Sequence, residues 1–391
     1  MSVRIASFNV ENLMSRFDFA EFRRKSRQLN KSGAGGRDRH ARLSKETMRV
    51  LQDLDSRAHD DDSRQLTALA LASCRSDIVC LQEVEDLATL EAFEDEYLYP
   101  MTGLSYPQKV WRQGNDSRGI DVALMARSHT ADGETITIDA VRSHRKLRFG
   151  DADLLTEELK EQGFEAHDRI FRRDCLEVDL RIGDGESRRR LTIFVCHFKS
   201  MGGGRNGVDG RQASRSLRVA EASAVRHIIE EKFGAERAAR MRWMICGDLN
   251  DYDERLVVDG EGAGERNFRH MEDDGGALDI LTRGDFAVDL VRRRPADDRW
   301  TLYHAAGPSK DARHPYDREV QHLVQLDYLL ASPAFATQNG NDAAIADILR
   351  HGQPLRTPMP PSQEVARYPR TGWSRPKASD HCPVAVTLNL R

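Results

Sequence analysis

The stretch Trp243-Met244-Ile245-Cys246-Gly247-Asp248-Leu249-Asn250 joins an apolar run to polar residues that follow it directly. Two other parts of the chain repeat this arrangement: Ile78-Val79-Cys80-Leu81 is followed by Gln82-Glu83, and residues 191–196 are followed by His197. Such apolar runs are typical of buried β-strands. Strands that end in acids, amides and imidazoles predict a functional site at one rim of a sheet.

The spacing of apolar residues predicts an α/β sandwich, in which sheets form the core and helices cover the faces. Helical periodicity precedes two of the predicted strands, at Leu66, Leu69, Ala70 and Cys74 and at Val219, Ala222, Val225 and Ile229. The predicted strands are residues 3–8, 78–81, 122–125, 191–196, 243–246, 328–330 and 384–388.

Composition restricts the class of protein. The 391 residues are 39% hydrophobic and 31% charged with a formal net charge of −4, which indicates a globular protein and argues against a uniformly basic coat for nucleic acid. No secretory leader or membrane-spanning run is recognised, and the six cysteines lack the C-x-x-C spacing. We therefore expect a reduced, cytoplasmic protein with no transmembrane segment, and no protein partner can be read from the sequence.

One domain spanning residues 1–391 is expected, because no linker divides the chain. Three stretches depart from the regular pattern and are predicted to be loop insertions. They are the basic segment near 16–49, the glycine- and arginine-rich segment near 201–218, and the proline-rich segment near 352–377.

Polar residues from distant parts of the chain follow or precede the predicted strands. Taken singly, each has a structural explanation as a turn former, a solvated charge or a core histidine. As a set they combine hard oxygen ligands with imidazoles, which favours Mg²⁺ or Mn²⁺ and metal-assisted phosphoester hydrolysis. The set is Asn9, Glu83, His197, Asp248, Asn250, Asp327, Asp380 and His381, with Glu11 close behind the first strand.

The order of these motifs resembles the endonuclease/exonuclease/phosphatase superfamily, and the resemblance covers nearly the whole chain. It rests on residues 4–13, Leu81-Gln82-Glu83-Val84-Glu85, residues 118–124, Cys196-His197-Phe198-Lys199-Ser200, Gly247-Asp248-Leu249-Asn250-Asp251, Leu326-Asp327-Tyr328 and residues 379–384. The resemblance implies a four-layer α/β sandwich of two mixed sheets packed face to face, with helices outside.

The resemblance also implies roles for individual residues. Metal binding falls to Glu83 as the principal ligand, with Asn9 and either Glu11 or Asp380 assisting. Asp248 orients or deprotonates the attacking water, and Asn250 holds that water or the phosphate. His381, oriented by Asp327, contacts the scissile phosphate, and His197 is a candidate general acid or phosphate donor. Which of Asp248 and the two histidines acts as acid or base stays open.

Basic residues near the motifs indicate which phosphoester is the substrate. Arg118 and Lys199 flank the motifs and are predicted to contact phosphates next to the scissile one. Other basic clusters, Arg188-Arg189-Arg190 among them, read more simply as solvated loops. The leading hypothesis is a Mg²⁺- or Mn²⁺-dependent nuclease acting on DNA or RNA.

Two alternatives remain open: a phosphatase or phosphodiesterase of a lipid or small metabolite, and a non-catalytic binding module. A dinucleotide site at Gly202-Gly203-Gly204-Arg205-Asn206-Gly207 is disfavoured, because this run does not open a βαβ unit. The chain contains no G-x-S-x-G elbow of a serine hydrolase.

Overall fold

The computed structural model of the chain describes residues 1–14, 61–116, 118–202, 210–260, 266–304, 321–337 and 345–390. The basic segment near 16–49 therefore lies outside the described residues, as do residues 203–209 of the second predicted insertion. From Gly210 onward that second stretch is helical. The third stretch, near 352–377, holds a single 3₁₀ turn, Pro361–Gln363, and is otherwise irregular.

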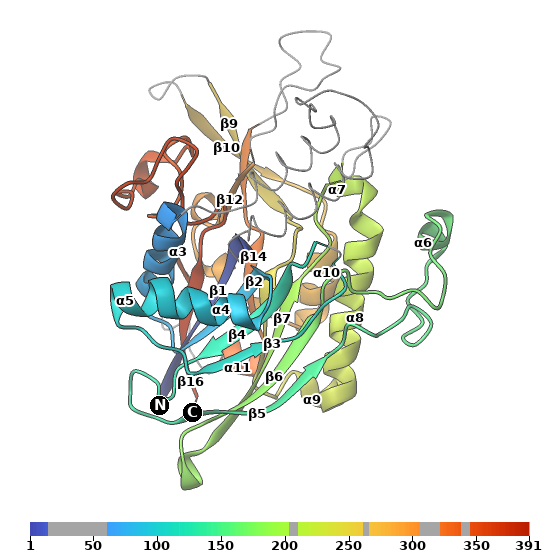
Figure 1. The fold of residues 1–391 in the computed structure, drawn as a ribbon. Coiled ribbons are helices and arrows are strands. Elements are labelled where there is room, and N and C mark those ends of the chain that lie inside the picture. The colour runs from blue at the N-terminus through green and yellow to red at the C-terminus, as the bar shows by residue number, and fades with distance from the viewer. Residues whose placement is uncertain are drawn as a thin grey trace, which may run out of the picture.

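Two six-stranded sheets form the centre of the molecule (Figure 1). The first sheet has the order β15-β16-β1-β2-β4-β3 and the second β11-β14-β8-β7-β6-β5. The first comprises β15 (Asp347–Ile348), β16 (Val384–Asn389), β1 (Ser2–Leu13), β2 (Ile78–Val84), β4 (Asp121–Ala126) and β3 (Gln108–Trp111). The second comprises β11 (Val288–Asp289), β14 (Asp327–Ala331), β8 (Trp243–Asp248), β7 (Arg189–His197), β6 (Cys175–Ile182) and β5 (Ile136–Ser143).

Both sheets are mixed, because β1 and β2 run parallel, as do β7 and β8, while the remaining pairs are antiparallel. Val3 and Ile5 of the first sheet and Val195 and Met244 of the second belong to one buried apolar cluster between the sheets. The opposite faces of the central strands are buried by helices, which gives those strands the nearly continuous apolar sequence from which they were predicted.

Helices α3 (Asp61–Cys74) and α4 (Leu87–Phe93) cover the outer face of the first sheet, and α8 (Arg215–Phe233) and α10 (Ala277–Thr282) cover that of the second. The predicted four-layer α/β sandwich is thus confirmed. Within the described ranges the other helices are a π-helical turn (Glu94–Leu98), α5 (Tyr99–Thr102), α6 (Glu157–Glu161), α7 (Gly210–Ala213), α9 (Ala235–Ala238) and α11 (Pro333–Thr337). Short 3₁₀ turns lie at Gly185–Ser187, Arg283–Asp285, Val291–Arg293 and Ala296–Asp298.

A third, four-stranded sheet extends beyond the sandwich and was not expected from the sequence (Figure 1). It is antiparallel, with the order β10-β9-β13-β12, and consists of β10 (Asn267–Glu272), β9 (Glu254–Asp259), β13 (His322–Val324) and β12 (Leu302–His304). An isolated bridge joins Leu302 of this sheet to His381, so it borders the same rim as the predicted site.

None of the described helices is both long and apolar enough to cross a membrane. All six cysteines are buried and none forms a disulfide, in keeping with their interpretation as small core residues.

Candidate active site

The predicted site residues converge because of how the strands run. The carboxyl ends of the parallel strands β1, β2, β7 and β8 lie at one rim, where the antiparallel strands β14 and β16 begin. His197 and Asp327 are each the register partner of Asp248, from the strands on either side of it. The backbone alone therefore places these three side chains side by side.

Gly247 permits the close approach of β7 and β8 at this rim. Its φ is +154°, a conformation that favours glycine, and a Cβ atom there would lie 1.9 Å from the carbonyl oxygen of Cys196. Any larger residue at this position would push apart the two strands that carry His197 and Asp248.

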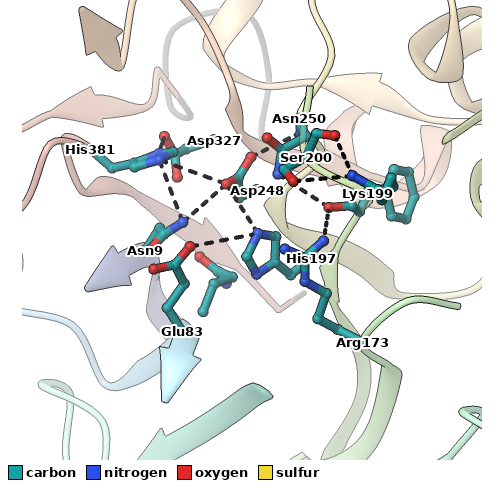
Figure 2. Close-up of polar contacts among 12 residues, drawn as sticks. Asn9, Glu83, Arg173, His197, Lys199, Ser200, Asp248, Asn250, Asp327 and His381 are labelled. Carbon is teal, nitrogen blue, oxygen red and sulfur yellow. Dashed lines mark hydrogen bonds and ion pairs between the residues drawn. The ribbon is translucent and has the colours of Figure 1, made fainter. Parts of the chain in front are cut away.

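The carboxylate of Asp248 is the centre of the site (Figure 2). Its Oδ2 atom accepts a hydrogen bond from Asn9 Nδ2 at 3.0 Å and lies 3.5 Å from His197 Nε2 and 3.7 Å from His381 Nε2. Its Oδ1 atom accepts a hydrogen bond from the backbone N–H of Asn250 at 2.9 Å. Burial raises the pKa of Asp248 to about 7, and the negative charge of Asp327 adds to the rise.

His381 and Asp327 form a buried carboxylate–imidazole pair, with 2.8 Å between Nδ1 of the histidine and Oδ2 of the aspartate. Burial lowers the pKa of His381, but the negative charges of Asp327 and Asp248 outweigh this effect and hold that pKa well above its usual range. The imidazole is thus a cation whose Nε2–H faces the site. Thr301 helps to position the pair, because its Oγ1 atom accepts a hydrogen bond from the backbone N–H of Asp327 at 3.2 Å.

His197 has the opposite character. Burial, together with the charge of Arg173, lowers its pKa well below the usual value, so the imidazole is neutral. Its Nε2 atom lies 4.0 Å from Glu83 Oε1, and its buried Nδ1 atom has no hydrogen-bond partner among the described residues. One rim therefore holds a neutral and a charged imidazole on either side of the same carboxylate.

Glu83 and Asn250 adopt left-handed backbone conformations, with φ of +68° and +50°. Glu11 and Asn12, beside Glu83, do the same at +50° and +60°. Four of the eight such non-glycine residues in the described part of the chain thus lie at this rim. Left-handed backbone is costly for residues with a Cβ atom and concentrates at functional sites.

Glu11 and Asp380 lie at the edge of the rim. Glu11 Oε2 accepts the backbone N–H of Asp380 at 2.9 Å and pairs with Lys377 Nζ at 2.8 Å, and Arg375 lies 3.5 Å from Oε1. The Glu11 carboxylate is thus already paired with cations, although burial and the nearby charge of Asp380 raise its pKa to about 7.

The two residues expected to bind substrate are engaged in local contacts. Arg118 binds Asp116 through Nε at 3.0 Å and Nη2 at 2.8 Å, with 43% of its side chain exposed. The ammonium group of Lys199 contacts the Ser200 carbonyl at 2.9 Å, and burial lowers its pKa. Arg118 keeps an exposed face toward solvent at the rim.

Arg173 belongs to the site but was not predicted from the sequence. This buried arginine donates from Nη1 to the carbonyl of Phe198 at 2.8 Å and lies 3.0 Å from Asp116 Oδ2 (Figure 2). The same carbonyl accepts Asn250 Nδ2 at 3.2 Å. The signal that points to Arg173 is the alternating run 175–182, which forms β6 beside β7 and puts the residues just before it at the rim.

Ser379 lies within the motif of residues 379–384, but its contacts in the site were not predicted from the sequence. It donates to the Asn9 carbonyl at 2.7 Å and accepts the His381 N–H at 3.0 Å, which fixes the start of the last strand against β1.

The donor set at the rim suits a divalent cation of the magnesium type. Within the described ranges no group of three or more His, Cys, Asp or Glu side chains is arranged to hold a metal ion. Mg²⁺, however, retains several waters and is commonly bound by only one or two carboxylates. Burial and the charge of Asp380 raise the pKa of Glu83, so a cation there would relieve the repulsion between two acids. Glu83 and Asn9 therefore fit the role expected of them.

Comparison with known proteins gives matches only at the level of structure. No family model matches the chain, and no curated protein matches it by sequence. Similar solved structures include truncated TDP2 of Caenorhabditis elegans (14% identity, TM-score 0.47, covering 99% of this chain and 97% of that one). An endonuclease/exonuclease/phosphatase family protein of Bacteroides thetaiotaomicron (13%, 0.47, 99% and 95%) and ANGEL2, described as a 2',3'-cyclic phosphatase (11%, 0.47, 100% and 96%), are similar to the same degree.

One of these descriptions names the superfamily that the sequence motifs resemble. At such identities and TM-scores the likenesses carry no argument about chemistry, so the function must be argued from the site itself.

Proposed function

We propose that this protein is a divalent-metal-dependent phosphodiesterase of the endonuclease/exonuclease/phosphatase type that hydrolyses nucleic-acid backbones. The observation that carries the proposal is the buried carboxylate of Asp248, within 3.7 Å of two imidazoles and 3.0 Å of the Asn9 amide. A carboxylate with a pKa of about 7 is poised to accept a proton near neutral pH.

In the proposed reaction a water molecule attacks phosphorus in line with the leaving oxygen. Asp248 accepts the proton of the water as the new P–O bond forms, and Asn250 helps to hold the water or the phosphate. The bond to the leaving oxygen then breaks, and the departing alkoxide takes up a proton from solvent. No covalent intermediate with the protein is required.

His381 supplies positive charge where negative charge develops. Its Nε2–H faces Asp248, and Asp327 at Nδ1 fixes the ring and stabilises the imidazolium. Neutral His197 offers a hydrogen bond from the other side without adding a second positive charge next to His381.

Glu83, with Asn9, would hold the metal ion. Bound there, Mg²⁺ or Mn²⁺ would offset charge on the phosphate oxygens and on the leaving group. Glu11, which is paired with Lys377, is better suited to position the strand end than to bind the metal.

Support for a nucleic-acid substrate comes from charge at the rim. Two guanidinium groups, of Arg118 and Arg173, share the carboxylate of Asp116, which leaves a net positive charge beside Glu83 and His197. Arg118 is exposed enough to contact a phosphate next to the scissile one. The single domain predicted over residues 1–391 would then present one such site, and a cytoplasmic location remains part of the proposal.

The test is a screen of labelled single- and double-stranded DNA and RNA, dinucleotides and phospholipid esters, each with Mg²⁺, Mn²⁺ or EDTA. The proposal expects strand cleavage that EDTA and Asp248→Asn abolish. Release of phosphate from a small ester, with every nucleic acid left intact, would instead identify a small-molecule or lipid phosphoesterase. The absence of any hydrolysis and of any metal binding would favour a non-catalytic binding module.

A further inference from the structure

A basic groove lies at the opposite end of the second sheet from the candidate active site. It encloses about 760 Å³ and is lined by two acids, several apolar residues and six basic side chains. We refer to this groove as the basic groove. Its six basic side chains are those of Arg188, Arg189, Arg190, Lys232, Arg240 and Arg242. At roughly 3.3 Å per residue, β7 separates Arg189 from His197 by about 26 Å.

The groove follows from sequence and topology together. One arginine run, 188–190, enters β7, and a second, Arg240 and Arg242, directly precedes β8. Because β7 and β8 are parallel, with Thr192 opposite Trp243, both runs lie at the same edge of the sheet. A hydrogen bond of 3.1 Å from the Thr192 N–H to the Arg242 carbonyl joins their backbones.

The two acids that line the groove, Asp139 and Asp179, already form hydrogen bonds or ion pairs with neighbouring side chains. Asp179 accepts hydrogen bonds from Thr192 Oγ1 at 2.6 Å and Lys232 Nζ at 2.9 Å, and Arg142 lies 3.2 Å from it. Asp139 pairs with Arg181. The two carboxylates are therefore paired with residues other than Arg188, Arg190 and Arg240.

The exposed arginines carry the excess charge. Arg188, Arg190 and Arg240 are exposed and form no ion pair with any residue in the described ranges. Burial and the charge of Arg189 lower the pKa of Arg242, which is the effect expected where like charges are crowded. In a chain with a net charge of −4, such a concentration of cations is a local feature.

We propose that the basic groove is a second binding site, for a compact anion with two or more linked phosphates. Arginine predominates over lysine in it, and the planar guanidinium group binds phosphate oxygens in pairs. The groove has the volume of a small-ligand site, and Phe233 and Leu191 give it apolar walls. The chemistry is shared by inorganic polyphosphate and by the triphosphate of a nucleotide. The inference does not depend on the proposed catalytic function.

The experiment measures binding of tripolyphosphate, and separately of ATP, by calorimetry in EDTA. Wild type is compared with the double variant Arg190→Glu/Arg240→Glu, with the control Arg75→Glu, which changes an exposed arginine at the end of α3, and with Arg118→Ala at the active-site rim. We expect the double variant to weaken tripolyphosphate binding at least tenfold, and each single variant to leave it within about twofold. Thermal melting of all four proteins checks that each is folded.

Comparing tripolyphosphate with ATP shows whether the groove binds phosphates alone or a nucleotide. Equal affinity for tripolyphosphate and ATP would support recognition of the phosphates alone, and tighter binding of ATP that the double variant abolishes would identify a nucleotide. The proposal is overturned if wild type binds neither, or if Arg118→Ala weakens binding while the double variant does not. A 12-nucleotide single strand is measured in the same way as a third ligand. The proposal is equally overturned if this strand alone binds and the double variant abolishes its binding, which would make the groove an extension of a nucleic-acid surface.

Discussion

The two ends of β7 and β8 differ in chemistry although the same pair of strands builds both. At the carboxyl end, His197 and Asp248 are buried in a network of acids, amides and imidazoles whose pKa values are displaced. At the amino end, arginines project into a groove open to solvent. Burial and mutual contact suit the first end to bond chemistry, whereas exposed, uncompensated charge suits the second to holding an anion.

The rim and the groove are also organised by different interactions. The rim is organised by contacts: Asp248 touches three other polar side chains, and shape and charge are fixed before substrate arrives. The groove is organised by charge alone. Substitutions at the rim should therefore affect hydrolysis, through kcat or through KM, and substitutions in the groove should affect only binding there.

The largest effect is expected from removing the metal or its carboxylate ligand. Glu83→Gln keeps the size of the side chain but removes its charge, and it should lower nuclease activity about 10³-fold, since a bound metal contributes several kcal/mol to the transition state. EDTA should act similarly on wild type. Calorimetry with Mn²⁺ measures the loss of binding directly, with Glu91→Gln, an exposed acid on α4, as the control. Undiminished Mn²⁺ binding by Glu83→Gln would place the metal elsewhere.

A smaller effect should follow from Asp327→Asn. The amide retains the shape of the side chain but no longer stabilises the imidazolium of His381 through the 2.8 Å contact. Partners that orient a catalytic histidine contribute roughly 10–100-fold to activity, so kcat should fall by that factor. The measurement is steady-state cleavage of a labelled oligonucleotide, with the melting temperature recorded alongside. If kcat stays at the wild-type value, His381 does not act as an imidazolium.

Arg118→Ala removes an exposed cation from the rim. The exposed guanidinium is proposed to contact a phosphate beside the scissile one, so KM should rise roughly tenfold while kcat changes little. The slope of log affinity against log salt should become shallower by about one. A loss confined to kcat would instead assign Arg118 to the chemical step.

The smallest effect concerns stability near the groove. Burial raises the pKa of Glu177, but hydrogen bonds from His144 and Lys232 outweigh it and hold that pKa at about 2, below the usual 4.5. A lowered folded-state pKa stabilises the fold above pH 4.5, and this stabilisation disappears as the pH falls toward 2. Glu177→Gln should cost about 1–3 kcal/mol at pH 7, as loss of hydrogen bonds to a charged group does.

Urea unfolding of wild type and Glu177→Gln at pH 7, 4 and 2.5 measures the contribution of Glu177 to the free energy of unfolding. The difference between the two proteins should shrink as the pH is lowered. A difference that stays constant over this range would show that packing rather than charge accounts for the effect.

The core strands could be predicted because helices or the facing sheet bury both of their faces. Every predicted strand is present in the structure and is longer than predicted; residues 243–246, for example, lie within β8, which continues to Asp248. Strands β5 and β6 were missed because the prediction followed nearly continuous apolar runs, whereas these two strands alternate polar with apolar residues. Such alternation is itself a signal of a half-buried strand. The four-stranded sheet was missed because β12 and β13 have only three residues each and β10 is mostly exposed and polar.

The predicted site residues could be found from their positions next to strands, and the structure brings Asn9, Glu83, His197, Asp248 and His381 together. What the sequence could not show was the protonation of the two histidines. The low pKa of His197 depends on its burial and on the charge of Arg173, which the sequence did not reveal. The pairing of Asp327 with His381 was implied by the resemblance, but the added effect of Asp248 on the pKa of His381 was not. The basic groove likewise required knowing that β7 and β8 are parallel neighbours.

The role of Asp248 in phosphodiester hydrolysis is tested by kcat/KM for a small activated phosphodiester, bis(4-nitrophenyl) phosphate, with Mn²⁺. The proteins compared are wild type, Asp248→Asn and Arg190→Glu/Arg240→Glu. We expect a loss of at least about 10³-fold for Asp248→Asn, because a general base and its charge are removed, and a value within about twofold of wild type for the groove variant. Activity retained by Asp248→Asn would contradict this role.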